Sequence, residues 1–242
     1  MVQVPSGVVV LTDRWQARRG LVDVVGAAVA GGARWVVLRE KDLPRAERAA
    51  LAADLRPILA EAGGTLVVAG PDPLGGDAAH LPAAGPYPPP RLGLVGRSCH
   101  DAAELARLTT EDYVTVSPVY PSRSKPGYGP PLRPARLGEL IRLSPVPVLA
   151  LGGIETPGQV RACVEAGAVG VAVLGAIMRA GDPGGAAAAL TIPFEPPRTR
   201  HDREEVSRTG LRPTGPTEGS GLTAPSGRGR PQPPTAGAGK RR

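Results

Sequence analysis

Short runs of apolar residues alternate with longer stretches rich in Ala and Leu between residues 8 and 190 of the 242-residue chain. A buried strand gives an apolar run of about four to eight residues, whereas a helix repeats its apolar positions roughly every three to four residues. The pattern predicts strands at residues 8–12, 35–39, 65–69, 77–81, 92–97, 113–117, 146–151 and 170–173. It predicts helices at residues 20–31, 44–62, 101–108, 136–143, 157–166 and 175–190. Gly31-Gly32 is expected to end the first helix, Asp101 to cap the third, and Pro57 to kink or shorten the second.

Strands that alternate with helices are typical of parallel β/α units, and eight such units close into a (β/α)8 TIM barrel. An open, doubly wound sheet would give the same alternation. The glycine fingerprint of dinucleotide-binding sheets does not follow the first strand, so the barrel is favoured. The composition agrees, because the chain is rich in Ala, Val and Gly and has one Phe, as in parallel sheets buried on both faces.

The character of the sequence changes after Leu190. Residues 191–242 lack apolar periodicity and are crowded with Pro, Gly, Ser and Thr, so we expect a disordered basic tail behind a barrel domain of residues 1–190. The tail carries ten Lys and Arg against five Asp and Glu, which is five of the seven net positive charges of the chain. The high pI therefore describes the tail, and nucleic acid is not an expected partner of the barrel.

Other global features exclude several classes of protein. Cys99 and Cys163 have no metal-ligand or disulfide spacing, which favours a reducing cytosol. No apolar run approaches the ~20 residues of a membrane span. The N-terminus is interpreted as a first strand and not as a signal peptide. The sequence is compatible with a homo-oligomer and does not set the oligomeric state.

The ends of the predicted strands carry the candidate functional residues, because barrel enzymes build their sites from the loops that follow the strands. Glycines after the seventh and eighth strands would let backbone N–H groups approach a phosphate, and cationic side chains and a hydroxyl would bind the rest of a substrate. The expected phosphate-binding residues are Gly152, Gly153 and Gly175, and the expected substrate-binding residues are Arg39, Lys41, Ser117 and Lys125. A tight turn explains the glycines equally well, and a solvated rim explains the cations.

His100 follows the fifth strand, where an imidazole could transfer protons. A role as a cap or rim residue is the alternative. Cys99 should point away from His100, because adjacent strand residues alternate faces, so a Cys–His nucleophile is not expected.

Several short motifs follow one another in order along the predicted barrel. They are Leu11-Thr12-Asp13, Leu38-Arg39-Glu40-Lys41, His80-Leu81, Gly96-Arg97-Ser98-Cys99-His100, Ser117-Pro118-Val119-Tyr120 with Lys125, Leu149-Ala150-Leu151-Gly152-Gly153-Ile154 and Gly170-Val171-Ala172-Val173. In this order and spacing, residues 8–190 resemble the thiamine phosphate synthase/TenI superfamily. The resemblance implies a compact (β/α)8 barrel and a thiazole phosphate as the small-molecule partner.

The superfamily that the chain resembles has two activities. Thiamine phosphate synthase joins a hydroxymethylpyrimidine diphosphate to a thiazole phosphate and uses magnesium to bind the diphosphate. TenI-type tautomerase isomerises a thiazole carboxylate phosphate without a metal. The synthase pattern has an Asn-Asp pair where this chain has Ala69-Gly70, an Asp near Gly85 and a Gln at Val37. Because magnesium prefers carboxylate ligands, these departures weaken the diphosphate half of the resemblance, although the displaced Asp13, Asp72 or Asp77 could compensate.

The chain matches the thiazole-phosphate half of the family pattern more closely than the diphosphate half, although Gly175 replaces a usual Ser. The sequence therefore favours a TenI-like thiazole tautomerase with His100 as general acid and base, and with no metal or other cofactor. The first alternative is a thiamine phosphate synthase, which would need magnesium. The second is a non-catalytic regulatory protein that binds a phosphate ligand.

Overall fold

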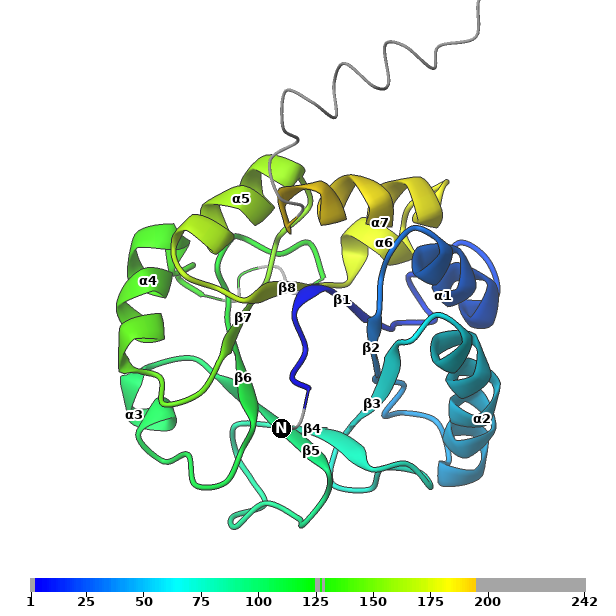
Figure 1. Ribbon diagram of the computed structural model, residues 1–242, viewed down its shortest axis with the longest axis horizontal. Helices are drawn as coiled ribbons and strands as arrows, with labels where there is room; N and C mark the ends of the chain where they lie inside the picture. The colour runs from blue at the N-terminus through cyan, green and yellow to red at the C-terminus, as the bar shows by residue number, and fades with distance from the viewer. Residues whose placement is uncertain (1–2, 125–126, 128, 195–242) are drawn as a thin grey trace, which may run out of the picture. The chain divides into compact units, whose positions relative to one another are not determined.

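The computed structural model describes residues 3–124, 127 and 129–194, and its eight strands form one closed barrel (Figure 1). Each strand pairs in parallel with the next along the chain, and the last pairs with the first. The strands are β1 (Gly7–Leu11), β2 (Trp35–Leu38), β3 (Thr65–Ala69), β4 (Ala78–Leu81), β5 (Leu94–Cys99), β6 (Tyr113–Val116), β7 (Val148–Leu151) and β8 (Gly170–Val173). The predicted (β/α)8 fold is confirmed.

Helices surround the barrel on its outside (Figure 1). They are α1 (Leu21–Ala30), α2 (Arg45–Glu61), α3 (Ala102–Leu105), α4 (Arg133–Leu143), α5 (Pro157–Glu165), α6 (Gly175–Met178) and α7 (Pro183–Thr191), with the 3₁₀ turn η1 (Ile192–Phe194) after α7. Asp101 caps α3 through its side chain, and Gly31 is the C-cap of α1, as predicted. None of the described helices is long and apolar enough to cross a bilayer.

Some predicted boundaries are wrong. The helix expected over residues 175–190 is two helices, α6 and α7, because Pro183 cannot continue a helix and Asp182 caps the next one by accepting from the Gly185 N–H. The fifth strand begins at Leu94 and continues to Cys99. α2 is not shortened at Pro57 and continues to Glu61. The predicted tail lies outside the described residues from position 195 onward.

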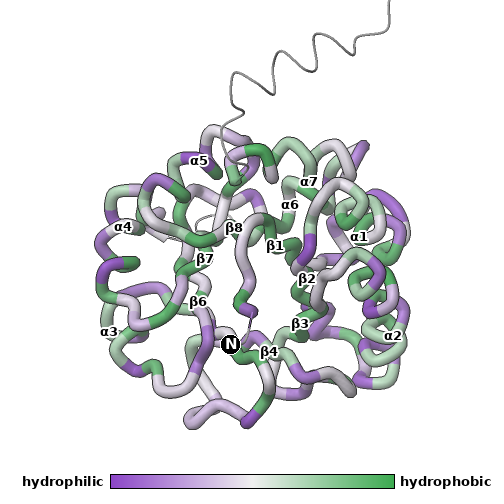
Figure 2. Tube along the Cα trace, viewed as in Figure 1, coloured by the Kyte–Doolittle hydropathy of each residue, from purple (hydrophilic) through white to green (hydrophobic). Residues whose placement is uncertain are grey.

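The core has two layers, because alternate strand residues face opposite sides of the barrel wall. One layer packs between the strands and the helices, and the other fills the inside of the barrel. Figure 2 shows the hydrophobic positions concentrated along the strands and the hydrophilic ones in the outer turns.

The N-terminal end of the barrel interior is filled by large side chains. Trp35 at the start of β2 and Tyr113 at the start of β6 are both buried there. Val4 packs against the same inner cluster, and the segment before β1 crosses the barrel in Figure 1. The space that remains open to a ligand is therefore at the opposite end, where the strands finish.

Candidate active site

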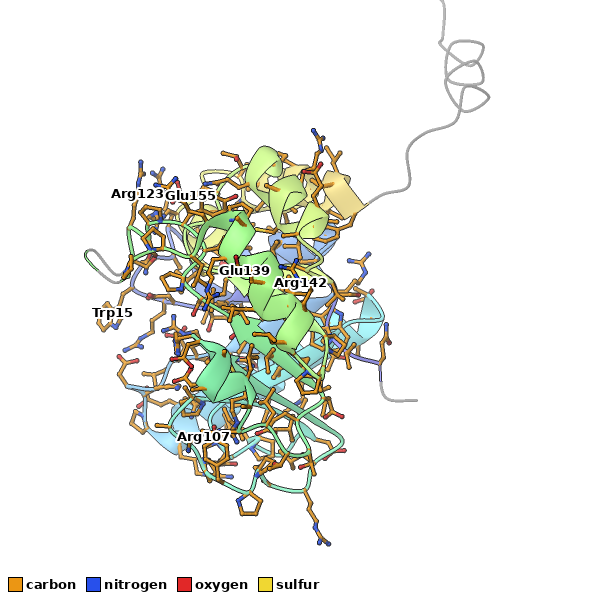
Figure 3. All side chains as sticks on the ribbon, turned by 90° about the vertical axis from the view of Figure 1, so that its left-hand side faces the viewer. Trp15, Arg107, Arg123, Glu139, Arg142 and Glu155 are labelled. Carbon is orange, nitrogen blue, oxygen red and sulfur yellow. The ribbon has the colours of Figure 1, made fainter. Side chains whose placement is uncertain are left out.

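A cavity of about 400 Å³ lies at the C-terminal ends of the strands. Figure 3, a side view, labels Arg123 and Glu155, which line this cavity, at the same edge of the barrel. Seven of the eight residues predicted for the site line the cavity: Arg39, Lys41, His100, Ser117, Gly152, Gly153 and Gly175. The eighth, Lys125, lies outside the described residues. The structure thus brings together residues from the ends of β2, β5, β6, β7 and β8.

Arg39 and Lys41 line the cavity, whereas the residue between them, Glu40, is buried and does not line it. The buried Glu40 carboxylate accepts hydrogen bonds from the Arg14 backbone N–H and from the Arg14 guanidinium, each at 3.2 Å. The Arg39 backbone N–H donates to the buried Thr12 hydroxyl at 2.9 Å. The loops after β1 and β2 are tied together by these bonds, which holds two cations at the rim of the cavity.

His100 is oriented by a carboxylate. Its Nδ1 atom lies 2.8 Å from the Glu104 Oε2 atom, and its backbone N–H donates to the same oxygen at 2.7 Å. Glu104 is held in turn by the cap of α3, since its N–H donates to Asp101 at 2.8 Å. A neutral imidazole that donates from Nδ1 keeps its basic lone pair on Nε2. This arrangement suits a proton-transfer role, which stays a prediction.

Cys99 faces away from the cavity, as the strand alternation predicts. It is buried in the outer layer of the core, between strands and helices. Burial raises the pKa of the Cys99 thiol to about 12, so the thiolate needed of a nucleophile is disfavoured.

A buried polar cluster forms the floor of the cavity, and the sequence did not identify it as part of the site. His80 Nδ1 lies 3.2 Å from the Tyr113 hydroxyl, while His80 Nε2 lies 3.0 Å from Ser98 Oγ and 3.3 Å from Thr115 Oγ1. Burial, with smaller effects from the charges of Lys41 and Arg97, lowers the pKa of His80 to about 3. His80 is therefore neutral near pH 7, and both of its ring nitrogens are engaged by the surrounding hydroxyls.

Gly152 and Gly153 are glycines for a reason that needs no ligand. Their φ angles are +105° and +66°, in the left-handed region that favours glycine. A Cβ on Gly152 would lie 2.9 Å from the Pro118 Cα, and a Cβ on Gly153 would lie 2.3 Å from the Pro121 carbonyl oxygen. The close approach of the loop after β6 explains both glycines, and it also leaves their backbone exposed to the cavity.

The magnesium ligands that the family resemblance implies do not fit this chain. Ala69, Gly70 and Gly85 supply no side-chain oxygen. Among the described residues, no three His, Cys, Asp or Glu side chains come together as a metal site.

The three aspartates that could have compensated each form an ion pair or hydrogen bonds with other residues of the chain. Asp72 pairs with Arg45 on the exposed surface of α2 at 2.7 Å. Asp77 precedes β4 and binds the Gly93 N–H at 2.8 Å, at the end of the barrel away from the cavity. Asp13 lines the cavity, but its two oxygens accept from the Trp15 N–H and the Gln16 amide. A magnesium site of the expected kind is therefore not built here.

These features together define a (β/α)8 barrel of the kind that binds small anionic metabolites at its strand ends. Residues 8–177 match the family model described as thiamine monophosphate synthase. The chain belongs to the thiamine phosphate synthase/TenI family, a family of thiamine biosynthesis.

Several relatives of the chain carry synthase names. The chain is 38% identical to a putative thiamine-phosphate synthase of Geobacter sulfurreducens, over 84% of this chain and 100% of that protein. It is 36% identical to a thiamine-phosphate synthase of Roseiflexus castenholzii, over 77% of this chain and 88% of that protein. A thiamine phosphate pyrophosphorylase structure from Pyrococcus furiosus has the same fold, with a TM-score of 0.66 and 24% identity over 77% of this chain and 94% of that one. The names of the two relatives favour a transferase, the first alternative of the sequence analysis, over the isomerase.

Proposed function

We propose that the chain is a thiamine-phosphate synthase, a transferase that joins a pyrimidine diphosphate to a thiazole phosphate. The observation that carries the proposal is the identity of 36–38% to proteins of that name, which covers 77–84% of this chain. Such an enzyme would work in the cytosol, which the two free cysteines also favour.

The coupling makes a bond between the thiazole nitrogen and the methylene carbon of the pyrimidine. The bond from that carbon to the diphosphate oxygen breaks, and the diphosphate leaves with the electron pair. Negative charge grows on the leaving group, so cations held at that place stabilise the transition state. Arg39 and Lys41 are the cations that we assign to this role, because they line the cavity and follow β2, the strand that carries Val37 of the predicted diphosphate half.

The rest of the cavity is suited to uncharged rings. Val37 and Ala69 give an apolar wall beside the neutral His80 floor. Such a wall excludes water, and the hydroxyls of Ser98 and Thr115, which line the cavity, can hydrogen-bond a heteroaromatic ring. The thiazole phosphate would bind with its phosphate toward Gly152, Gly153 and Gly175.

A coupling assay with both substrates and magnesium tests the proposal. We expect thiamine phosphate as the product, and Arg39→Ala should lower kcat/KM on the order of 10²-fold. Arg45→Ala is the matched control, because Arg45 is exposed on α2 and paired with Asp72. Its activity should equal that of the wild type. If the wild type forms no thiamine phosphate with both substrates and magnesium present, the proposal is wrong.

The tautomerase remains a second candidate because one observation favours it. The family's magnesium ligands are missing, whereas His100 is oriented by Glu104 for proton transfer. An assay with the thiazole carboxylate phosphate alone would then give the isomerised thiazole, and His100→Ala would lower the rate by ~10²–10⁴-fold. If the wild type bound the thiazole phosphate but turned it over in neither assay, the regulatory binding protein of the sequence analysis would be supported.

A further inference from the structure

The guanidinium of Arg179 lies over Gly175, at the end of the cavity assigned to the phosphate. Both residues line the cavity, and Arg179 directly follows α6. A Cβ built on Gly175 would lie 2.2 Å from both Nη1 and Nη2 of Arg179. The guanidinium therefore occupies the space that a side chain at position 175 would need. The family resemblance implies a Ser at that position, so this chain has an arginine head group where a hydroxyl is expected.

Arg179 is held in place by the loops that follow three different strands. Its Nη1 donates to Gln16 Oε1 at 2.5 Å, after β1, and lies 3.5 Å from Ser124 Oγ, after β6. Its Nη2 donates to Glu155 Oε1 at 2.9 Å, after β7. The hydrogen bonds to described residues use Nη1 and Nη2, of a group with five N–H donors. Donor capacity thus remains for a ligand in the cavity.

The orientation of Gln16 shows that this arrangement is built from more than one contact. The Gln16 amide nitrogen donates to Asp13 Oδ2 at 2.6 Å, so its carbonyl oxygen is turned toward Arg179. The same oxygen accepts from the Ser124 hydroxyl at 3.1 Å. Asp13 and Gln16 together set the position of the guanidinium, and a preset cation binds an anion with less loss of side-chain freedom.

We propose that Arg179 is the charged side chain that binds the phosphate of the thiazole ligand, in place of a hydroxyl at position 175. The inference rests on the proposed function, since it assigns the phosphate of that substrate to this end of the cavity. A planar guanidinium matches two phosphate oxygens, and its hydrogen bonds to a charged acceptor are stronger than those of a serine hydroxyl. Glu155 accepts from Arg179 Nη2, and its negative charge beside the guanidinium disfavours a second anion at the same place.

A purely structural brace would explain the contacts to Gln16 and Glu155 but would act on the phosphate only indirectly. Removing a brace would loosen three loops and weaken every ligand of the cavity alike. Removing a side chain that binds the phosphate weakens the binding of the phosphate ester and leaves the binding of the corresponding alcohol unchanged. The comparison of these two ligands separates the interpretations.

Calorimetric titration of the thiazole phosphate and of the unphosphorylated thiazole alcohol tests the inference. We expect Arg179→Ala to raise the Kd of the phosphate ester by about 10- to 100-fold and to leave the Kd of the alcohol within about twofold. Arg179→Lys should give an intermediate loss of affinity for the ester, because lysine keeps the positive charge but cannot donate two parallel hydrogen bonds as a guanidinium does. Arg136→Ala is the matched control, since it removes an exposed arginine that is paired with Glu139 on α4.

Two further variants test the effect of the Glu155 charge and the replacement of a hydroxyl at position 175 by the Arg179 guanidinium. Glu155→Gln should tighten binding of the ester, because it removes a negative charge beside the guanidinium. Gly175→Ser combined with Arg179→Ala should recover part of the affinity lost in Arg179→Ala alone, because a hydroxyl then fits in the space that the guanidinium leaves. Thermal melting checks that each variant is folded.

The inference is overturned if Arg179→Ala leaves the Kd of the ester unchanged, if it weakens ester and alcohol alike, or if the wild type does not bind the ester. The coupling assay is read separately. If the ester binds in an Arg179-dependent way and no thiamine phosphate forms, the proposed function fails and the inference stands.

Discussion

The Arg97 Nε atom lies 2.5 Å from the Glu111 Oε1 atom, and neither side chain is exposed to solvent. The other guanidinium nitrogens donate to the Pro82 and Pro86 carbonyls at 3.0 and 2.8 Å, and the Tyr87 ring lies under the guanidinium. A loop connects β4 to β5 at this place, whereas a helix follows most other strands. One buried ion pair therefore fixes the loop that contributes Pro82 to the wall of the cavity.

Glu111→Gln should destabilise the fold by about 3–5 kcal/mol, because Arg97 would remain buried with its charge uncompensated. Burial alone would raise the pKa of Glu111, but the Thr109 N–H and Arg97 together hold that pKa below its usual value, so the carboxylate is charged near pH 7. Urea unfolding measures the change. The exposed pair Arg136–Glu139 is the control, and Glu139→Gln should cost at most about 1 kcal/mol. Equal losses for the two variants would contradict the assigned role of the buried pair.

His80 should make the stability of the barrel depend on pH. Its pKa is lowered from 6.5 to about 3 in the folded chain, so between these values the unfolded chain binds more protons than the folded chain. The contribution of neutral His80 to the free energy of unfolding is fully present above about pH 6.5 and is lost as the pH falls toward 3. The free energy of unfolding then falls by at most about 1.4 kcal/mol per pH unit. Denaturant melts at pH 7, 6 and 5 give that slope.

The His80 slope can be separated from the loss of a hydrogen bond. His80→Gln removes the titrating group and should flatten the dependence, whereas Ser98→Ala removes one partner at 3.0 Å and should keep it. A His80→Gln slope equal to that of the wild type would show that other groups cause the pH dependence.

Gly96→Ala should destabilise the barrel by about 1–3 kcal/mol through overpacking. A Cβ on Gly96 would lie 2.1 Å from the Tyr113 ring, which is buried and hydrogen-bonded to His80. The ring would have to move, and the floor of the cavity would move with it. Gly26→Ala in α1 is the control: nothing lies within 4 Å of its added Cβ, so thermal melting should show no loss of stability. If Gly96→Ala left the stability unchanged, the floor of the cavity would be loosely packed.

The strand order and most of the cavity were predictable from the sequence, because parallel barrels place every strand end on one face. Arg39 and His100 were found for this reason alone. Arg179 was missed because it follows α6 and reaches Gln16 across 163 positions of sequence, a contact that no local pattern contains. His80 was missed as part of the site because only the registers of β4 with β5 and of β5 with β6 show which hydroxyls it meets. The division between α6 and α7 was signalled by Asp182-Pro183, but the continuous Ala-rich pattern outweighed it.

The C-terminal boundary of the barrel can be tested by truncation. Phe194 packs against the outer core layer, four residues beyond the predicted boundary at Leu190. Removal of residues 195–242 should leave the melting temperature unchanged, as the composition of that segment predicts. Removal of residues 191–242 should lower it by several degrees, because the packing of Phe194 and the last residue of α7 are lost. Equal melting temperatures for the two truncations would move the boundary back to Leu190.

Magnesium should have little effect on the binding of diphosphate to this chain. The family pattern places carboxylates where this chain has Gly70 and Gly85, and both glycines have φ angles above +100° that an Asp could adopt only with strain. Asp13 is the acidic side chain nearest to compensating, but hydrogen bonds to Trp15 and Gln16 engage both of its oxygens. The cations Arg39 and Lys41 then carry the interaction with the anion. Titration of inorganic diphosphate with magnesium or with a chelator should give Kd values within about threefold of each other, less than the tenfold change that 1.4 kcal/mol would produce. A tightening by magnesium of tenfold or more, abolished in Asp13→Asn and kept in the surface control Asp72→Asn, would instead identify Asp13 as a metal ligand.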